Sequence, residues 1–113
     1  MSKDYKAFAQ EVDARAANLF KAAPDTMRAY RGIMEGSSKE GALDAKTKEL
    51  MALAIGIELR CDGCIVYHAR AAQCHGANRE EVADTISVAV ELGGGPSAVY
   101  GAEALAAFDQ FAA

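Results

Sequence analysis

The chain has 113 residues, 51% of them hydrophobic, and its formal net charge is -4 at pH 7. This length suits one domain, which we place over residues 1–113, and the 12 Lys and Arg residues are too dispersed for the basic patch of a nucleic-acid-binding protein. No apolar run reaches the ~18 residues of a membrane span, and residues 1–6 lack the apolar core of a secretory signal, so we expect a cytoplasmic protein without a membrane segment.

Apolar residues recur at helical spacing from the first residues onward. Residues 3–22 place Phe8, Val12 and Leu19 on one face, which predicts an amphipathic helix. A shorter helix is expected after Pro24, because proline suits the first turn of a helix. Its apolar positions are Met27, Tyr30, Ile33 and Met34, and the Gly-Ser-Ser run at residues 36–38 is expected to end it.

A third and a fourth helix are predicted near the middle of the chain. The third covers residues 45–59, and Asp44 can cap it by accepting hydrogen bonds from its free amides. It is apolar nearly all round, which is typical of a helix in the middle of a bundle. The fourth covers residues 62–75, and Gly76 is its stop signal.

Two further helices complete the predicted fold. Asn78 can cap a helix over residues 79–92, and Pro96 opens a last helix that extends to about residue 111. We interpret the glycine run at residues 93–95 as the turn between them, since a phosphate-binding loop would have a strand before it and a Lys-Ser/Thr pair after it. No segment alternates as a strand would. The sequence therefore predicts an all-α bundle of about six helices.

The most distinctive motif is a C-x-x-C formed by Cys61 and Cys64, followed four residues later by His68. Two thiols at this spacing can close a disulfide with little backbone movement, and such motifs favour the reactive thiolate. On a helix Cys64 and His68 share a face. The positive end of the helix dipole stabilises a thiolate, and Cys64, inside the first turn, should gain most from the free amides. The pattern favours a redox-active dithiol.

An acidic partner for His68 is expected on the preceding helix. Glu49 lies about 15 Å back along that helix from its end. If the next helix returns antiparallel, His68 lies about 6–10 Å along the return path, so the two side chains can approach each other. A carboxylate that orients an imidazole is a common arrangement for moving protons. Glu58 is the rival acid, because it is nearer to the cysteines in sequence.

Together these residues form the pattern E-x11-C-x-x-C-x3-H over residues 49–68. This resembles the core signature of AhpD-like alkylhydroperoxidases in the carboxymuconolactone decarboxylase superfamily. The similarity continues through residues 75–77 and 91–96, so it covers roughly residues 40 to 110. The resemblance implies an AhpD-like fold of a single domain.

The resemblance also implies roles for the four residues. Cys64 would attack a peroxide, Cys61 would be the resolving thiol, and Glu49 and His68 would relay the proton. A hydroperoxide or disulfide would be the substrate, and a thiol reductant protein, not identified by the sequence, would reset the pair. No cofactor or metal is expected.

Two further expectations concern assembly and efficiency. The apolar excess for this length suggests surfaces buried between subunits. The resemblance implies a homo-oligomer, a trimer or a hexamer, and we favour the hexamer. Some peroxidase members carry a second histidine directly before the second cysteine, where this chain has Gly63. This departure bears more on peroxidase efficiency than on the dithiol chemistry.

Two alternatives stay open at this stage. A lactone decarboxylase, as in the namesake of the superfamily, would not need the thiol pair. A non-enzymatic oligomer could hold zinc through Cys61, Cys64 and His68, with His75 as a fourth ligand, although structural zinc sites usually draw on two separated ligand pairs. We interpret His75 as an ordinary helix-end residue and Cys74, which lies off the face of the other two cysteines, as a packing residue.

Overall fold

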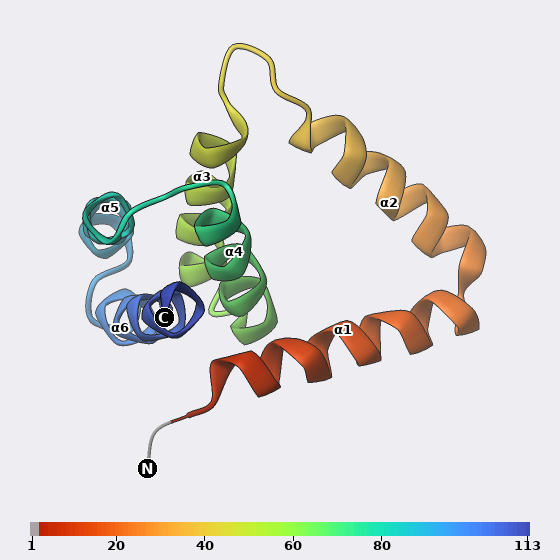
Figure 1. Ribbon diagram of the computed structural model, residues 1–113, viewed down its shortest axis with the longest axis horizontal. Coiled ribbons are helices and arrows are strands. Elements are labelled where there is room, and N and C mark those ends of the chain that lie inside the picture. Colours follow the sequence, from red (N-terminus) through yellow and green to blue (C-terminus); the bar gives the residue numbers. More distant parts are fainter. Residues whose placement is uncertain (1–2) are drawn as a thin grey trace.

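The computed structural model describes residues 3–113, which fold into helices joined by short turns (Figure 1). Within these residues there are six α-helices and no strand, so the predicted all-α bundle is confirmed. The helices are α1 Tyr5–Ala22, α2 Pro24–Ser38, α3 Ala45–Glu58, α4 Asp62–Cys74, α5 Arg79–Gly93 and α6 Gly95–Ala112. No helix in this part of the chain combines the length and the apolar character needed to cross a bilayer.

The second helix ends at Ser38, within the Gly-Ser-Ser run that was expected to end it. The glycine run at residues 93–95 interrupts the helices at Gly94 alone. Gly94 has a φ of 69°, in the left-handed region that glycine adopts at little cost, and one such residue is enough to redirect the chain.

Helices α3 to α6 form the body of the molecule. α3 packs against α4 and α5, and α6 packs against α4 and α5. The largest fully buried side chains are Leu53, Ile57, Val66 and Val82. Alanines fill much of the remaining core, and their small side chains let the helices approach closely; the fully buried ones are Ala69, Ala72, Ala104 and Ala107.

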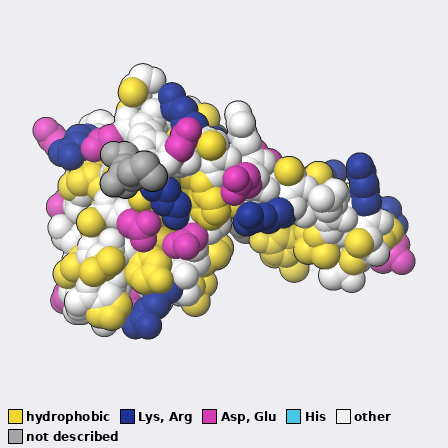
Figure 2. Space-filling model, turned by 90° about the horizontal axis from the view of Figure 1, so that it is seen from below, with side chains coloured by type: hydrophobic (Ala, Val, Ile, Leu, Met, Phe, Trp, Pro, Cys, Tyr) yellow, Lys and Arg dark blue, Asp and Glu magenta, His cyan; other side chains and the backbone are white. Residues whose placement is uncertain are grey.

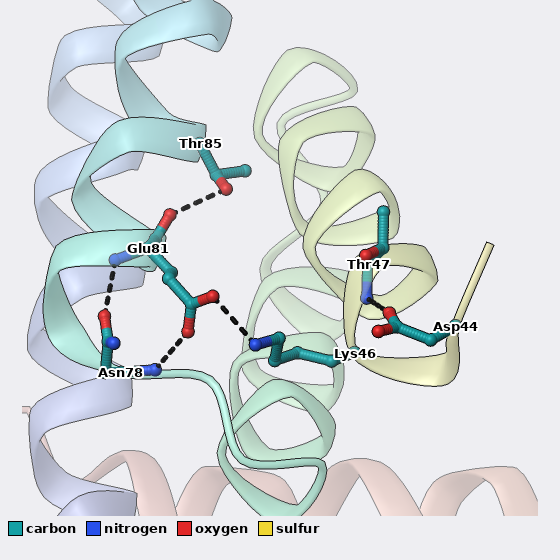
Figure 3. Close-up of polar contacts among 6 residues, drawn as sticks. All are labelled: Asp44, Lys46, Thr47, Asn78, Glu81 and Thr85. Carbon is teal, nitrogen blue, oxygen red and sulfur yellow. Dashed lines mark hydrogen bonds and ion pairs between the residues drawn. The ribbon is translucent and has the colours of Figure 1, made fainter.

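The N-terminal ends of α3 and α5 are fixed to each other by polar contacts (Figure 3). Asp44 caps α3 by accepting from the Thr47 amide at 2.8 Å, as predicted. Asn78 caps α5 and forms a capping box with Glu81. The Glu81 carboxylate also lies 2.8 Å from Lys46 Nζ of α3. This pairing holds two of the body helices in register.

The α1–α2 pair forms an arm that leaves the body (Figures 1 and 2). In α1 the buried residues are Tyr5 and Ala9, both near its start. No residue of α2 is buried, and Tyr30 and Ile33 are 52% and 69% exposed. The apolar face predicted for the second helix therefore exists but is not covered within one chain.

The third helix is not buried all round, which corrects the prediction from its composition. Leu53 and Ile57 face the core, whereas Met51 and Ile55 are 48% and 57% exposed. Met51 and Val88 line one shallow hollow between α3 and α5. We call this exposed apolar surface the α3–α5 face; its large side chains are Met51, Ile55, Leu59, Val88 and Leu92.

Candidate active site

The turn between α3 and α4 carries the two cysteines of the C-x-x-C motif. Cys61 and Cys64 form a disulfide at the N-terminal end of α4. Cys61 is the N-cap, and its Sγ accepts a hydrogen bond from the Cys64 amide at 3.2 Å. We expected Cys64 to gain most from the free amides. In this structure the amide points at Cys61 instead, because a capping side chain folds back over the first turn.

A glycine on α3 allows the cysteines to lie close to that helix. A Cβ atom at Gly56 would be only 3.2 Å from the Cβ of Cys64. The carbonyl of Gly56 also accepts from the Cys61 amide at 3.1 Å. Arg60, between the two helices, has a φ of 54° and makes the tight reversal. These features place the first turn of α4 directly against α3.

Glu49 and His68 lie beside each other on facing helices. Glu49 Oε2 of α3 is 2.7 Å from His68 Nδ1 of α4. Both side chains are mostly buried, with 16% and 26% exposed. When Nδ1 donates to the carboxylate, Nε2 is the ring nitrogen that exchanges protons. The geometric expectation that these two residues meet is therefore fulfilled, while their role in catalysis stays a prediction.

A groove of about 810 Å³ runs between α1, α2 and the start of α4. Cys61, Cys64 and His68 lie along it, together with Tyr67. Its other wall is largely apolar and comes from α1 and α2, through Val12, Ala16, Phe20, Met27, Tyr30 and Met34. The disulfide thus lies at the surface of a large, mainly apolar groove, with an imidazole one helical turn beyond Cys64.

Helix α1 covers Gly63, the second of the two residues between the cysteines. A Cβ atom at Gly63 would lie 3.6 Å and 3.7 Å from the two methyl groups of Val12. These are ordinary packing distances, so the space beside position 63 is already taken by α1. A histidine at this position, as in some peroxidase members, would have to displace Val12 or turn away from it.

An ion pair fixes the same part of α1 to α4. Arg70 Nη1 and Nη2 lie 2.9 Å and 3.0 Å from the carboxylate oxygens of Asp13. The guanidinium lowers the pKa of Asp13, and the carboxylate raises the pKa of Arg70. The Tyr67 ring lies 5.5 Å from the Arg70 guanidinium and 5.0 Å, edge to face, from the His68 ring. Asp13 and Tyr67 both line the groove.

Sequence reasoning did not find this second group of residues. Asp13 and Arg70 are 57 positions apart, and each reads as an ordinary surface charge on its own helix. The one available signal was the amphipathic pattern of the first helix, which places Val12 on its apolar face. That pattern does not say which helix the face meets.

Three other candidates do not line the groove. Glu58, the rival acid, accepts from Ser97 Oγ at 2.6 Å, next to the turn between α5 and α6. His75 is the C-cap of α4, as its interpretation as a helix-end residue predicted, about 20 Å along the helix from Cys61. Cys74 is exposed, so its interpretation as a packing residue is wrong for this chain. Among residues 3–113, no three His, Cys, Asp or Glu side chains are grouped to hold a metal ion.

Comparison with known proteins identifies relatives over nearly the full length. The model of the carboxymuconolactone decarboxylase family matches residues 24–107. A crystal structure of a protein of that family from Legionella pneumophila has a TM-score of 0.94 and 38% identity, and the match covers 99% of this chain and 100% of that one. An uncharacterized protein from Cupriavidus necator is 38% identical over 109 residues, 96% of each chain.

A second solved structure comes from a protein with a suggested physiological role. It is a carboxymuconolactone decarboxylase family protein from Thermotoga maritima that has been suggested to take part in an antioxidative response. Its TM-score is 0.70 and its identity 30%, over 75% of this chain and 88% of that one.

Proposed function

This chain belongs to the carboxymuconolactone decarboxylase family, and we propose that it is an AhpD-like thiol-dependent peroxidase or disulfide oxidoreductase. The observation that carries the proposal is the position of the Cys61–Cys64 disulfide, in an open groove beside the His68–Glu49 pair. A dithiol that can close and reopen, next to a group that moves protons, is what peroxide reduction by thiols requires.

In the first step Cys64 attacks the hydroperoxide. The Cys64 thiolate bonds to one peroxide oxygen as the O–O bond breaks, which gives a sulfenic acid and an alkoxide. The alkoxide leaves as an alcohol after it takes a proton. His68 supplies this proton, and the Glu49 carboxylate stabilises the charged imidazole between transfers.

In the second step Cys61 resolves the intermediate. The Cys61 thiolate attacks the sulfenic sulfur of Cys64, the S–O bond breaks, and water leaves with a proton from the relay. The sum is one hydroperoxide and two thiols converted to one alcohol, one water and the Cys61–Cys64 disulfide. A thiol reductant protein then returns two electrons and two protons by disulfide exchange. No cofactor takes part.

The choice of Cys64 as the attacking thiol has support and one opposing observation. His68 follows Cys64 by one helical turn, so it faces the same side of α4 and can take the thiol proton. The amide of Cys64, however, donates to Cys61, which would stabilise a thiolate there. Variants that each lack one of the two cysteines decide between the assignments. The variant without the attacking thiol loses the first oxidation step, and the other variant keeps it.

The alternatives to this chemistry have less support. Decarboxylation of a lactone would leave a closely placed dithiol without a role. The antioxidative role suggested for the Thermotoga maritima relative agrees with peroxide reduction. Zinc stabilisation is tested directly by the metal content of the purified protein, where one zinc per chain with unreactive thiols would replace our proposal.

We further propose that the protein is a homo-oligomer, with the hexamer preferred. Two apolar surfaces remain open in a single chain: the α3–α5 face and helix α2. A 15-residue helix that buries no residue is marginal in water, and contiguous apolar patches usually mark interfaces. A second copy of the chain is the partner that would cover both.

The deciding experiment counts free thiols and measures the intact mass before and after one equivalent of cumene hydroperoxide. We expect the loss of two thiols per chain, a mass lower by two hydrogen atoms, and a peptide map that joins Cys61 to Cys64. Thiols that stay unchanged after prolonged incubation would overturn the proposal.

A further inference from the structure

The part of α1 that lines the groove contacts the hydrophobic core through one partly buried side chain, Val12. The buried residues of α1 are Tyr5 and Ala9, and from Val12 to Ala22 every side chain is half-buried or exposed. Yet Val12 packs over Gly63, between the two cysteines. Because this stretch buries so little beyond Val12, a polar contact can decide how it lies against α4.

The ion pair between Asp13 and Arg70 connects this stretch of α1 to α4. It is the one salt bridge between α1 and α4 within residues 3–113, and it lies next to Val12 in sequence. Arg70 Nη1 donates to Asp13 Oδ2, and Arg70 Nη2 donates to Asp13 Oδ1. A two-point contact of this kind fixes direction as well as distance, so it sets how α1 lies across the start of α4.

Tyr67 links this ion pair to the proton-transferring pair. Its ring lies 5.5 Å from the Arg70 guanidinium and 5.0 Å, edge to face, from the His68 ring, and it lines the groove. A shift of Arg70 would therefore displace the Tyr67 ring beside His68, and it would also change the position of α1.

We propose that Asp13 and Arg70 form a clamp that determines specificity: it holds Val12 over Gly63, limits the approach to the cysteines from the side of α1, and so selects slender electrophiles over bulky ones within the groove. With hydroperoxides this selection rests on the proposed function. Asp13 and Arg70 are positioning residues that act through Val12 and Tyr67, and they take no part in the chemistry.

Access to the cysteines can be measured without any peroxide. The reduced protein is labelled with N-methylmaleimide or with the much larger N-(1-pyrenyl)maleimide, and the rates at Cys61 and Cys64 are followed by peptide mass spectrometry. Exposed Cys74 is the reference within the same molecule. In Asp13→Asn and Arg70→Gln we expect the ratio of bulky to small labelling at the groove cysteines to rise several-fold, with no change in that ratio at Cys74.

A matched control and a rescue separate the clamp from general loosening. Arg79 and Asp109 form another interhelical Arg–Asp pair, at 2.9 Å and 3.3 Å, between α5 and α6. Arg79→Gln should leave the labelling ratio at the wild-type value. The charge swap Asp13→Arg with Arg70→Asp should bring the ratio back toward the wild type.

Two results would overturn the clamp. One is a labelling ratio that stays the same in both clamp variants. The other is an equal rise in Arg79→Gln, which would mean that any broken ion pair opens the groove. Rates with hydrogen peroxide and cumene hydroperoxide are measured alongside. If neither peroxide reacts, the proposed function fails, while the maleimide ratio still decides for or against the clamp.

Discussion

His68 Nδ1 lies 2.7 Å from Glu49 Oε2, and this contact joins helices α3 and α4 beside the groove that holds the cysteines. With Nδ1 donating to the carboxylate, the ring is held in one orientation and Nε2 is left free. The proposed function needs this orientation when His68 exchanges protons with the thiol and the peroxide.

Glu49→Gln should slow disulfide formation with cumene hydroperoxide by roughly 10- to 100-fold, part of the ~10²–10⁴-fold that a positioned general acid or base contributes. The amide keeps a hydrogen-bond acceptor for Nδ1 but loses the charge. The measurement is the rate of thiol loss under a fixed excess of peroxide. Glu58→Gln is the matched control, since Glu58 bonds Ser97 instead and the rate should stay near wild type. Equal slowing in both variants would remove Glu49 from the relay.

The three cysteines should differ sharply when each is replaced by serine. Cys64→Ser should abolish peroxide consumption, because the attacking thiol is gone. Cys61→Ser should allow one turnover and then accumulate a sulfenic acid on Cys64, which dimedone traps. Cys74→Ser should react like the wild type. Sulfenic acid trapped on Cys61 in the Cys64→Ser variant would reverse the two roles, in line with the amide hydrogen bond to Cys61.

The number of helices and the meeting of Glu49 with His68 were predictable because both depend on local periodicity and on one short connection. Caps at Asp44 and Asn78 give the helix starts. A tight turn between two helices forces them antiparallel, and the 3.6-residue repeat then pairs Glu49 with His68. Local rules are sufficient for such a feature.

The clamp and the exposed faces were not predictable from the same rules. Whether an apolar face is covered depends on which helices meet, and the sequence does not state that for Met51 or Ile33. The pairing of Asp13 with Arg70 depends on the crossing of α1 over α4, a tertiary fact. The amide bond to Cys61 depends on which cysteine caps the helix, and helix starts are uncertain by a residue or two.

Two glycines beside the cysteines should respond differently to alanine. Alanine gains about 1 kcal/mol over glycine in a helix interior such as position 56, and less at Gly63, the second residue of α4, so a lower stability at position 56 would come from packing. At Gly63 the added Cβ meets Val12 at ordinary distance, whereas at Gly56 it comes within 3.2 Å of the Cys64 Cβ. Gly56→Ala should be less stable than Gly63→Ala by about 1–3 kcal/mol, the typical cost of overpacking. Urea unfolding of the oxidised protein measures this difference. Equal stabilities would contradict the close packing of α3 against the first turn of α4.

A charge on the α3–α5 face should disrupt the proposed oligomer. Ile55→Lys and Leu92→Lys each place an ammonium within an apolar surface, where an unpaired charge is costly once a partner covers it. Light scattering after gel filtration should show a smaller species for these variants. Gln10→Lys, on an exposed polar position of α1, is the control and should keep the wild-type mass. An unchanged mass in all three variants would exclude this face from the interface.

The Asp13–Arg70 pair should leave a signature in the pH dependence of stability. Arg70 lowers the pKa of Asp13 in the folded protein below its usual value of 3.8. Because the folded protein holds the proton less tightly, the pair contributes its full stabilisation above that value and loses it as the pH falls through the folded pKa. The contribution is at most about 1 kcal/mol, since the pair is partly exposed. The stability difference between wild type and Asp13→Asn should therefore be constant from about pH 5 to 8 and shrink below about pH 4. Thermal unfolding across this range measures it, and a difference that instead grows on acidification would show that Asp13 is not ionised in the fold.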